Sequence, residues 1–293
     1  MTVMIPNAQG GGYDITARTM TNIMENAGIT GHIDVFNVVG DDETVAMARL
    51  MKESGNDQLM MMMGLGMVGA CYSRHSTYRP TDATPLAELT EQPEIVVVPA
   101  DSPYRSIGQL VNAWKARPGS VTVGGGSSTG GPNYLFPMLL AKAVGIPPAR
   151  VRYRAFSGDG DMLPALLAHT VTFGASGMAE YSDQIAAGQL RVLATSASAT
   201  SAGGVPSLKA SGIDLVFDNW HGVLAPPGIS AAARSHLIEM LTRLRASPQW
   251  RQALVANGWT DAFKTGSAFA RFLTAQERLE AQVMQQLDGA HAD

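Results

Sequence analysis

The segment Thr2–Asp14, with the sequence TVMIPNAQGGGYD, decides the fold. An apolar strand-like run at its start is separated by three consecutive glycines from a helix that we expect at about residues 14–27. Such glycines present backbone N–H groups at a helix N-terminus, where the partial positive charge favours an anion. Asp14 is expected to be the N-cap of that helix. The pattern predicts an α/β protein with a polar, anion-binding first loop, although a plain tight turn is the alternative.

The same pattern recurs later in the chain. A strand is expected at residues 120–123, a helix at residues 132–144, and between them lies Gly124–Gly131 with the sequence GGGSSTGG. Its N–H and O–H groups can surround a carboxylate, and several bonds to a charged group support micromolar affinity, roughly −8 kcal/mol, without any arginine. A flexible surface loop is the alternative interpretation.

Short apolar strands alternate with helix-like segments along the rest of the chain, which is the pattern of a mostly parallel sheet. The other strands are expected at residues 33–39, 59–63, 94–99, 151–153, 171–173, 190–194 and 217–224. The other helices are expected at residues 43–52, 107–116, 161–168, 230–245, 249–257 and 267–286. We therefore expect two lobes joined by crossing strands, with residues 1–100 and 220–293 in lobe 1 and residues 101–219 in lobe 2.

Composition excludes several classes of protein. The 293 residues are 45% hydrophobic and 16% charged with a net charge of −4, as expected for a folded globular chain without a basic block for nucleic acid. The longest apolar run, at residues 59–63, is far below the ~20 residues that cross a bilayer. Cys71 is the single cysteine, and no grouping of His, Asp or Glu has metal-ligand spacing, so neither a metal nor a cofactor is expected. No signal peptide precedes the first strand, which indicates either a cytoplasmic protein or a mature form without its leader.

An enzymatic alternative comes from the second glycine loop. Residues 126–130 match the G-x-S-x-G pattern of a nucleophile elbow, which would make the chain an α/β-hydrolase-like serine esterase using Ser128. The required acid and histidine have weak candidates: Asp218 and His221 are three residues apart, and His236 lies in a helical pattern. We therefore expect a binding protein rather than an enzyme.

A dinucleotide-binding alternative comes from residues 64–69, a literal G-x-G-x-x-G that follows a strand. A Rossmann fold requires a helix next and then an acidic strand end about 20 residues further on. Residues 73–80 look turn-like instead, and no strand ends at Asp82. We expect the match to be accidental.

The order of the motifs resembles the substrate-binding family of the tripartite tricarboxylate transporters, also called Bug receptors. The resemblance rests on Pro6 with Gly10–Asp14, the turn Asp101–Tyr104, the loop Gly125–Gly130, residues 163–167, 187–194 and 205–208, and the segment Trp220–Gly228. It spans nearly the whole chain, so it is more specific than any single glycine loop.

The resemblance implies a two-lobe, type II periplasmic-binding-protein-like fold. It implies an extracytoplasmic, periplasmic monomer that captures a small organic acid or an acidic amino-acid-like ligand in an interlobe cleft and meets membrane transporter subunits transiently. A ligand sensor for a membrane kinase has the same cleft and stays open. The implied ligand-binding residues are Gly10, Gly11, Gly12, Tyr13, Asp14, Gly64, Leu65 and Gly66 in lobe 1, and Ser127, Ser128, Thr129, Gly130, Ser157, Gly158 and Ser176 in lobe 2.

The chain departs from the family after the second strand. The family usually carries Asn-Arg-Pro-Gly-Ala-Gly-Gly there, whereas this chain has Asn37–Glu43 with the sequence NVVGDDE. If the acidic residues Asp41–Glu43 face the ligand, they repel a second carboxylate and favour an ammonium, amide or hydroxyl group. If they point outward, they start a helix, where negative charge is stabilised by the macrodipole.

Overall fold

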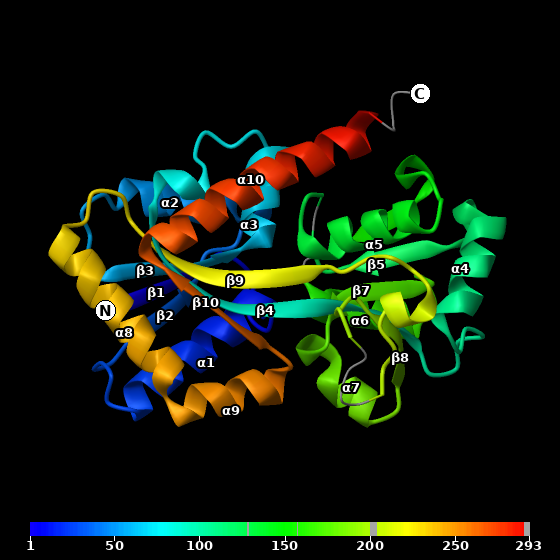
Figure 1. Ribbon diagram of the computed structural model, residues 1–293, viewed down its shortest axis with the longest axis horizontal. Coiled ribbons are helices and arrows are strands. Elements are labelled where there is room, and N and C mark those ends of the chain that lie inside the picture. The colour runs from blue at the N-terminus through cyan, green and yellow to red at the C-terminus, as the bar shows by residue number, and fades with distance from the viewer. Residues whose placement is uncertain (128, 157, 200–203, 290–293) are drawn as a thin grey trace. The chain divides into compact units, whose positions relative to one another are not determined.

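The computed structural model describes residues 1–127, 129–156, 158–199 and 204–289 (Figure 1). The chain divides into two compact units. Unit 1 consists of Met1–Glu91 and Trp220–Ala281, and unit 2 consists of Gln92–Asn219 and Gln282–Asp293. Each unit has a sheet covered by helices, so the predicted α/β class is confirmed.

Unit 1 has a mixed sheet in the order β2-β1-β3-β9-β4, with β10 paired to β4. Its strands are β1 (Thr2–Ile5), β2 (Asp34–Asn37), β3 (Leu59–Gly64), the first part of β4 (Thr84–Pro99), most of β9 (Asp218–Ala225) and β10 (Thr260–Thr265). β1 is parallel to β2 and β3, whereas β9 and β10 run antiparallel to their partners. The sheet is therefore parallel only in the part that carries the first glycine loop.

Helices cover both faces of this sheet. They are α1 (Gly12–Asn26), α2 (Thr44–Lys52), α3 (Leu65–Ser73), α8 (Ala231–Ala246), α9 (Pro248–Asn257) and α10 (Gly266–Gly289). Figure 1 shows α1, α8 and α9 together on one side of the strands, with α2 and α3 on the other. Met60 and Met62 pack into the core with the first group, while Met61 and Met63 point to the opposite face and are also fully buried. Burial on both faces explains why β3 is a continuous apolar run.

Unit 2 repeats this arrangement. Its strands are the second part of β4, β5 (Thr122–Gly125), β6 (Arg152–Ala155), β7 (Phe173–Gly177) and β8 (Leu190–Thr195), and its helices are α4 (Ile107–Ala116), α5 (Pro132–Ala143), α6 (Asp159–Leu167) and α7 (Ser182–Ala186). β5 is parallel to β6 and β7, and β4 is antiparallel to β7 and β8. The parallel strands β5, β6 and β7 all end at the same edge of the sheet.

The core of unit 2 follows the alternation along β4. Val96 and Val98 pack with α4 and α5, where Trp114 is fully buried, and Ile95 and Val97 pack on the other face with α6. Burial of each such valine or isoleucine side chain contributes about 1.5–3 kcal/mol to folding stability. The Val-rich strand is therefore central, and it fixes the position of the residues that precede it in β4.

Three segments differ from the sequence prediction. Residues 65–73 form helix α3, which was not expected, because this apolar segment is buried almost throughout and so lacks the amphipathic pattern that reveals a helix. β10 and the first part of β4 were not expected, because each is polar and gains its strand conformation from antiparallel pairing with the other.

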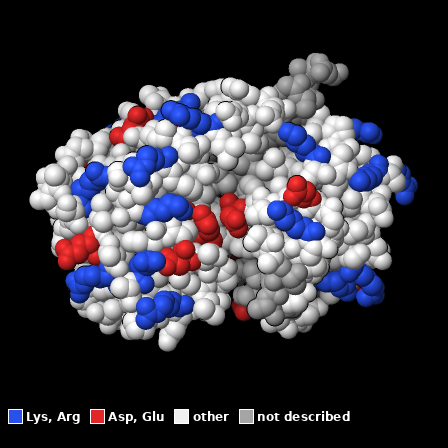
Figure 2. Space-filling model, in the orientation of Figure 1, with Lys and Arg blue, Asp and Glu red and all other residues white. Residues whose placement is uncertain are grey.

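One face of the molecule shows how the charged side chains are distributed. On the face drawn in Figure 2, basic and acidic side chains are interspersed rather than gathered in one large patch of a single sign. Within the part of the chain that the structure describes, no helix has the length and hydropathy to cross a membrane.

Candidate functional site

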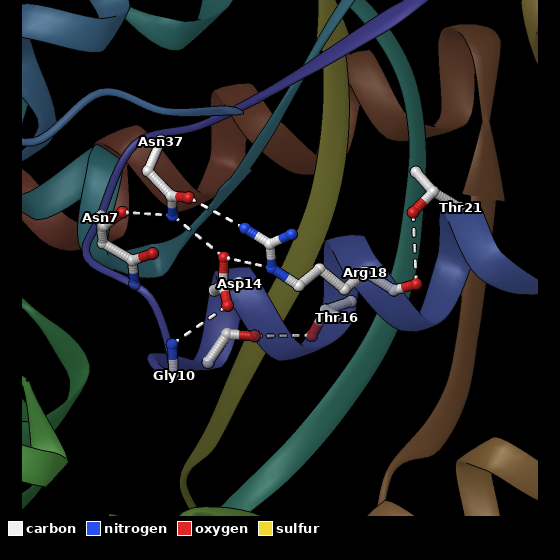
Figure 3. A network of polar contacts seen from close by, with 8 residues as sticks. Asn7, Gly10, Asp14, Thr16, Arg18, Thr21 and Asn37 are labelled. Atoms are coloured by element: carbon white, nitrogen blue, oxygen red, sulfur yellow. Dashed lines mark hydrogen bonds and ion pairs between the residues drawn. The ribbon is translucent and has the colours of Figure 1, made fainter. Parts of the chain in front are cut away.

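The first glycine loop of unit 1 is organised by one carboxylate (Figure 3). Asp14 is 4% exposed, and its Oδ2 accepts a hydrogen bond from the Gly10 backbone N–H at 3.0 Å. Its Oδ1 accepts from Arg18 Nε at 2.9 Å and from Asn37 Nδ2 at 3.0 Å. The predicted N-cap role is wrong, because α1 begins at Gly12 with Gly11 as its N-cap and Asp14 lies inside the first turn.

The network ties the loop to β2. Asn37 Nδ2 also donates to the Asn7 carbonyl at 2.8 Å, and Arg18 Nη2 donates to Asn37 Oδ1 at 3.0 Å. Burial raises the pKa of Asp14, but the donors from Arg18, Asn37 and Gly10 outweigh it and hold this pKa below its usual value. Asp14 is therefore ionised at neutral pH and neutralised by Arg18. Among the described residues, no side chain caps the N-terminus of α1.

Tyr13 joins the first loop to the start of α3. Its hydroxyl accepts a hydrogen bond from the Met67 backbone N–H at 3.2 Å. A Cβ on Gly64 would lie 2.8 Å from Tyr13 Cε1 and would overlap the Trp220 carbonyl, and a Cβ on Gly66 would lie 2.8 Å from the Tyr13 hydroxyl. The structure thus brings Gly10–Asp14 and the predicted residues Gly64, Leu65 and Gly66 together within unit 1. Because Tyr13 already occupies an N–H at the start of α3, this end of the helix is not shaped for a pyrophosphate.

The three acidic residues of the segment Asp41–Glu43 do not point the same way. All three residues have positive φ angles, of 42°, 51° and 78°, a conformation that is uncommon for residues other than glycine. Asp41 and Asp42 form ion pairs with Arg74, whereas Glu43 turns inward, with its Oε1 3.0 Å from the Cβ position of Gly66. Burial raises the pKa of Glu43 to about 8, in spite of a hydrogen bond with Tyr13.

His221 is a structural residue of unit 1 rather than a base. It is 3% exposed, its Nδ1 lies 2.8 Å from Thr16 Oγ1, and its ring packs edge-on against Tyr13. Burial lowers its pKa to about 3. In a serine triad this nitrogen would contact a carboxylate, so the His221 environment does not support the esterase alternative. The other candidate, His236, is exposed on α8.

The second glycine loop, in unit 2, is held by its neighbours. Ser127 Oγ accepts a hydrogen bond from the Asn133 backbone N–H at 3.0 Å, and the Tyr153 hydroxyl donates to the Ser127 carbonyl at 2.5 Å. A Cβ on Gly126 would lie 2.7 Å from the Asp159 backbone nitrogen. The loop after β5 therefore packs directly against the loop after β6.

The remaining predicted residues of unit 2 fall into four groups. Thr129 is exposed, and Gly130 and Gly158 adopt φ angles of 90° and 124° that favour glycine. Ser176 on β7 is fully buried. Ser128 and Ser157 lie outside the described residues.

Sequence reasoning missed a group of carboxylates at this edge of unit 2. They are Glu94 on β4, Asp159 at the start of α6 and Glu180 after β7. Glu94 is fully buried, and its Oε2 accepts from Asn133 Nδ2 at 2.9 Å. The sequence does contain one indication of this group, because Glu94 lies directly before the Val-rich part of a strand, where a charged residue is unexpected. No group of three or more His, Cys, Asp or Glu residues in the described ranges is arranged to hold a metal ion.

The chain is similar to receptors of one transporter family. The model of the tripartite tricarboxylate transporter family receptors matches residues 15–288. A curated relative from Cupriavidus necator, named UPF0065 protein in gbd 5'region, is 28% identical over 200 residues, which cover 67% of this chain and 59% of the relative. The chain therefore spans less than two thirds of that relative's length.

Solved structures share the fold. MatC from Rhodopseudomonas palustris with bound malate has a TM-score of 0.85 at 22% identity, covering 97% of this chain and 98% of its own. The periplasmic binding protein BugD has a TM-score of 0.87 at 18% identity, covering 98% of this chain and 97% of its own. The architecture is thus that of a two-lobe periplasmic binding protein, as the sequence predicted.

Proposed function

The chain belongs to the tripartite tricarboxylate transporter receptor family, and from this premise we propose that it captures a small carboxylate-bearing solute outside the cytoplasm for a membrane transporter. The family and the periplasmic-binding-protein fold indicate an extracytoplasmic receptor. The neighbour with bound malate supports a carboxylate as the ligand.

One observation carries the proposal. In each unit a glycine loop follows a parallel strand and leads into a helix whose N-cap is a glycine, at Gly11 for α1 and at Gly131 for α5. A glycine N-cap offers no side-chain acceptor, so backbone N–H groups in the first turn of α1 remain for an anion. In α5 Pro132 has no N–H and the Asn133 N–H donates to Ser127 Oγ, so the donors that remain in the second loop are its hydroxyls. In this proposal a ligand carboxylate in unit 2 accepts from the hydroxyls of Ser127 and Thr129. The loop Gly10–Gly12 offers a second set of donors in unit 1.

In this proposal no acid, base or nucleophile takes part. A fluorophosphonate should label nothing at Ser128, and a specific adduct there would favour the esterase instead.

A thermal-shift screen of mono-, di- and tricarboxylates and acidic amino acids tests the function directly. Saturation at 100 times Kd stabilises the folded protein by about 2.7 kcal/mol. Thr129→Val, which removes one exposed hydroxyl, should then weaken the best acid about tenfold, because a bond to a charged group contributes about 1.5–3 kcal/mol. The matched control is Thr242→Val on α8, which should leave the affinity unchanged. A screen in which no carboxylate stabilises the protein would contradict the proposal.

A further inference from the structure

Three carboxylates in unit 2 lie at the carboxyl edge of the sheet without a counter-ion. Glu94 is fully buried, and Asp159 and Glu180 are half-buried. In the part of the chain that the structure describes, none of the three forms an ion pair with Lys, Arg or His. Burial and the neighbouring carboxylates raise the pKa of Glu94 well above its usual value and that of Asp159 to about 7.

The sheet register brings these groups together. Gly177, the last residue of β7, is paired with Glu94 of β4, and the Glu180 carboxylate lies directly over the Cβ position of Gly177. Asp159 Cγ is 3.0 Å from the Cβ position of Gly126 in the second glycine loop. The carboxylates therefore surround the ends of β5, β6 and β7, which is where open α/β sheets bind ligands.

Buried oxygens without a hydrogen-bond partner give an independent indication of a ligand. Gln92 is 5% exposed, and its Nε2 donates to Glu180 Oε1 at 3.4 Å, so its amide belongs to the same group. Gln92 Oε1 has no hydrogen-bond partner among the described residues. The same is true of one oxygen on each of Glu94, Asp159 and Glu180. Buried polar atoms are normally satisfied, so this set of oxygens fits a ligand that brings several hydrogen-bond donors.

We propose that Glu94, Asp159 and Glu180 bind a positively charged ammonium group of the ligand, so that the captured acid also carries an amine. An ammonium group has three donors and no acceptor, which complements this set of oxygens. Its charge also relieves the repulsion among the three carboxylates. The carboxylate of the same molecule binds the adjacent loop at Ser127 and Thr129, so this inference rests on the proposed function.

Matched pairs of acids that differ only by an amine test the proposal. Calorimetric titration at pH 7.5 compares glutarate with glutamate, succinate with aspartate, and valerate with 5-aminovalerate. In at least one pair, the amine-bearing acid should bind at least tenfold more tightly. Glu94→Gln, which keeps the acceptor for Asn133, should weaken that acid about ten- to a hundredfold and leave the plain acid unchanged or stronger. Glu180→Gln, at a half-buried position, gives the same test if the first variant does not fold.

The control is Glu88→Gln, in the unit 1 part of the same strand. Glu88 is also fully buried with a raised pKa, but it is paired with Lys264 and lies about 20 Å along β4 from Glu94. This variant should leave the ratio of the two affinities unchanged.

The outcomes separate the two proposals. If the plain acids bind as tightly as their amine partners and Glu94→Gln leaves the ratio unchanged, the ammonium site is refuted while the carboxylate receptor stands. If 1,5-diaminopentane binds as well as 5-aminovalerate, the ammonium site stands and the carboxylate function fails. If no member of any pair binds, both are refuted.

Discussion

Replacing Asp14 with asparagine tests how the first glycine loop is held in shape. The carboxylate accepts three hydrogen bonds, from Gly10, Arg18 and Asn37. Asparagine has nearly the same size as aspartate, but its amide nitrogen would face one of these three donors. At least one hydrogen bond is therefore lost, and the remaining bonds no longer have a charged acceptor. Bonds to a charged group contribute about 1.5–3 kcal/mol against about 1 kcal/mol for neutral ones. The ion pair adds little, because Arg18 is 40% exposed and such pairs contribute at most about 1 kcal/mol.

These magnitudes add to a loss of about 3 kcal/mol in the free energy of unfolding of unit 1. At about 2 °C per kcal/mol for a chain of this size, the midpoint of thermal unfolding falls by about 6 °C. Urea denaturation and scanning calorimetry measure the change. The control is Asp57→Asn, at an exposed carboxylate that accepts from Gln58 Nε2 and whose loss should change stability by less than about 0.5 kcal/mol.

The pH dependence gives a second measure of the same interaction. The folded pKa of Asp14 lies below its unfolded value of about 3.9. Its contribution is therefore fully present above pH 4 and disappears as the pH falls through the folded pKa. The difference between wild type and Asp14→Asn should be constant from pH 5 to 7 and shrink below pH 4. A difference under about 0.5 kcal/mol at pH 7, or one that persists unchanged at pH 3, would refute the role of the carboxylate.

Three shorter predictions concern the same unit. Gly64→Ala should lower stability by about 3 kcal/mol or prevent folding, because the new Cβ overlaps the Trp220 carbonyl; near-native urea unfolding would contradict this. The pKa of Glu43 is raised to about 8, so the contribution of its protonated form to folding stability is present below pH 4 and lost as the pH rises to 8. In thermal melts across pH 5–8, Glu43→Gln should therefore flatten the decline of the melting temperature with pH. Parallel curves for wild type and variant would exclude this role of Glu43. Exchanging both Asp41 and Asp42 for asparagine should leave the relative affinity for mono- and dicarboxylates within twofold, because both pair with Arg74; a larger shift in calorimetric titration would place them at the ligand.

Elements with a local signal were predictable from the sequence. Helix α4 is observed at Ile107–Ala116, the predicted bounds, because Ser106 caps it and its apolar residues repeat on one face. Both glycine loops were recognised because each lies between an apolar strand and a helix. Helix α3 was missed because Leu65–Ser73 is apolar on all sides, a pattern that only tertiary burial explains.

The carboxylates of unit 2 were not predictable, because no local pattern joins them. Glu94, Asp159 and Glu180 are dispersed over 87 positions of sequence and meet only through the register of β4 with β7 and the packing of the loops after β5 and β6. The sequence-based expectation that the loop Gly124–Gly131 surrounds a carboxylate rested on its hydroxyls and glycines alone.

Charge in the two units limits which acids the protein accepts. In unit 1 Arg18 is already neutralised by Asp14, the carboxylate that holds the glycine loop. In unit 2 the N-terminus of α5 offers about half a positive charge, which cannot balance Glu94, Asp159 and Glu180 when they ionise. A ligand with several negative groups and no ammonium group would repel these three carboxylates when they are ionised, or would keep Glu94, Asp159 and Glu180 protonated. A ligand with an ammonium group beside its carboxylate satisfies the acids and the loop together, so a zwitterion fits the described residues better than a tricarboxylate.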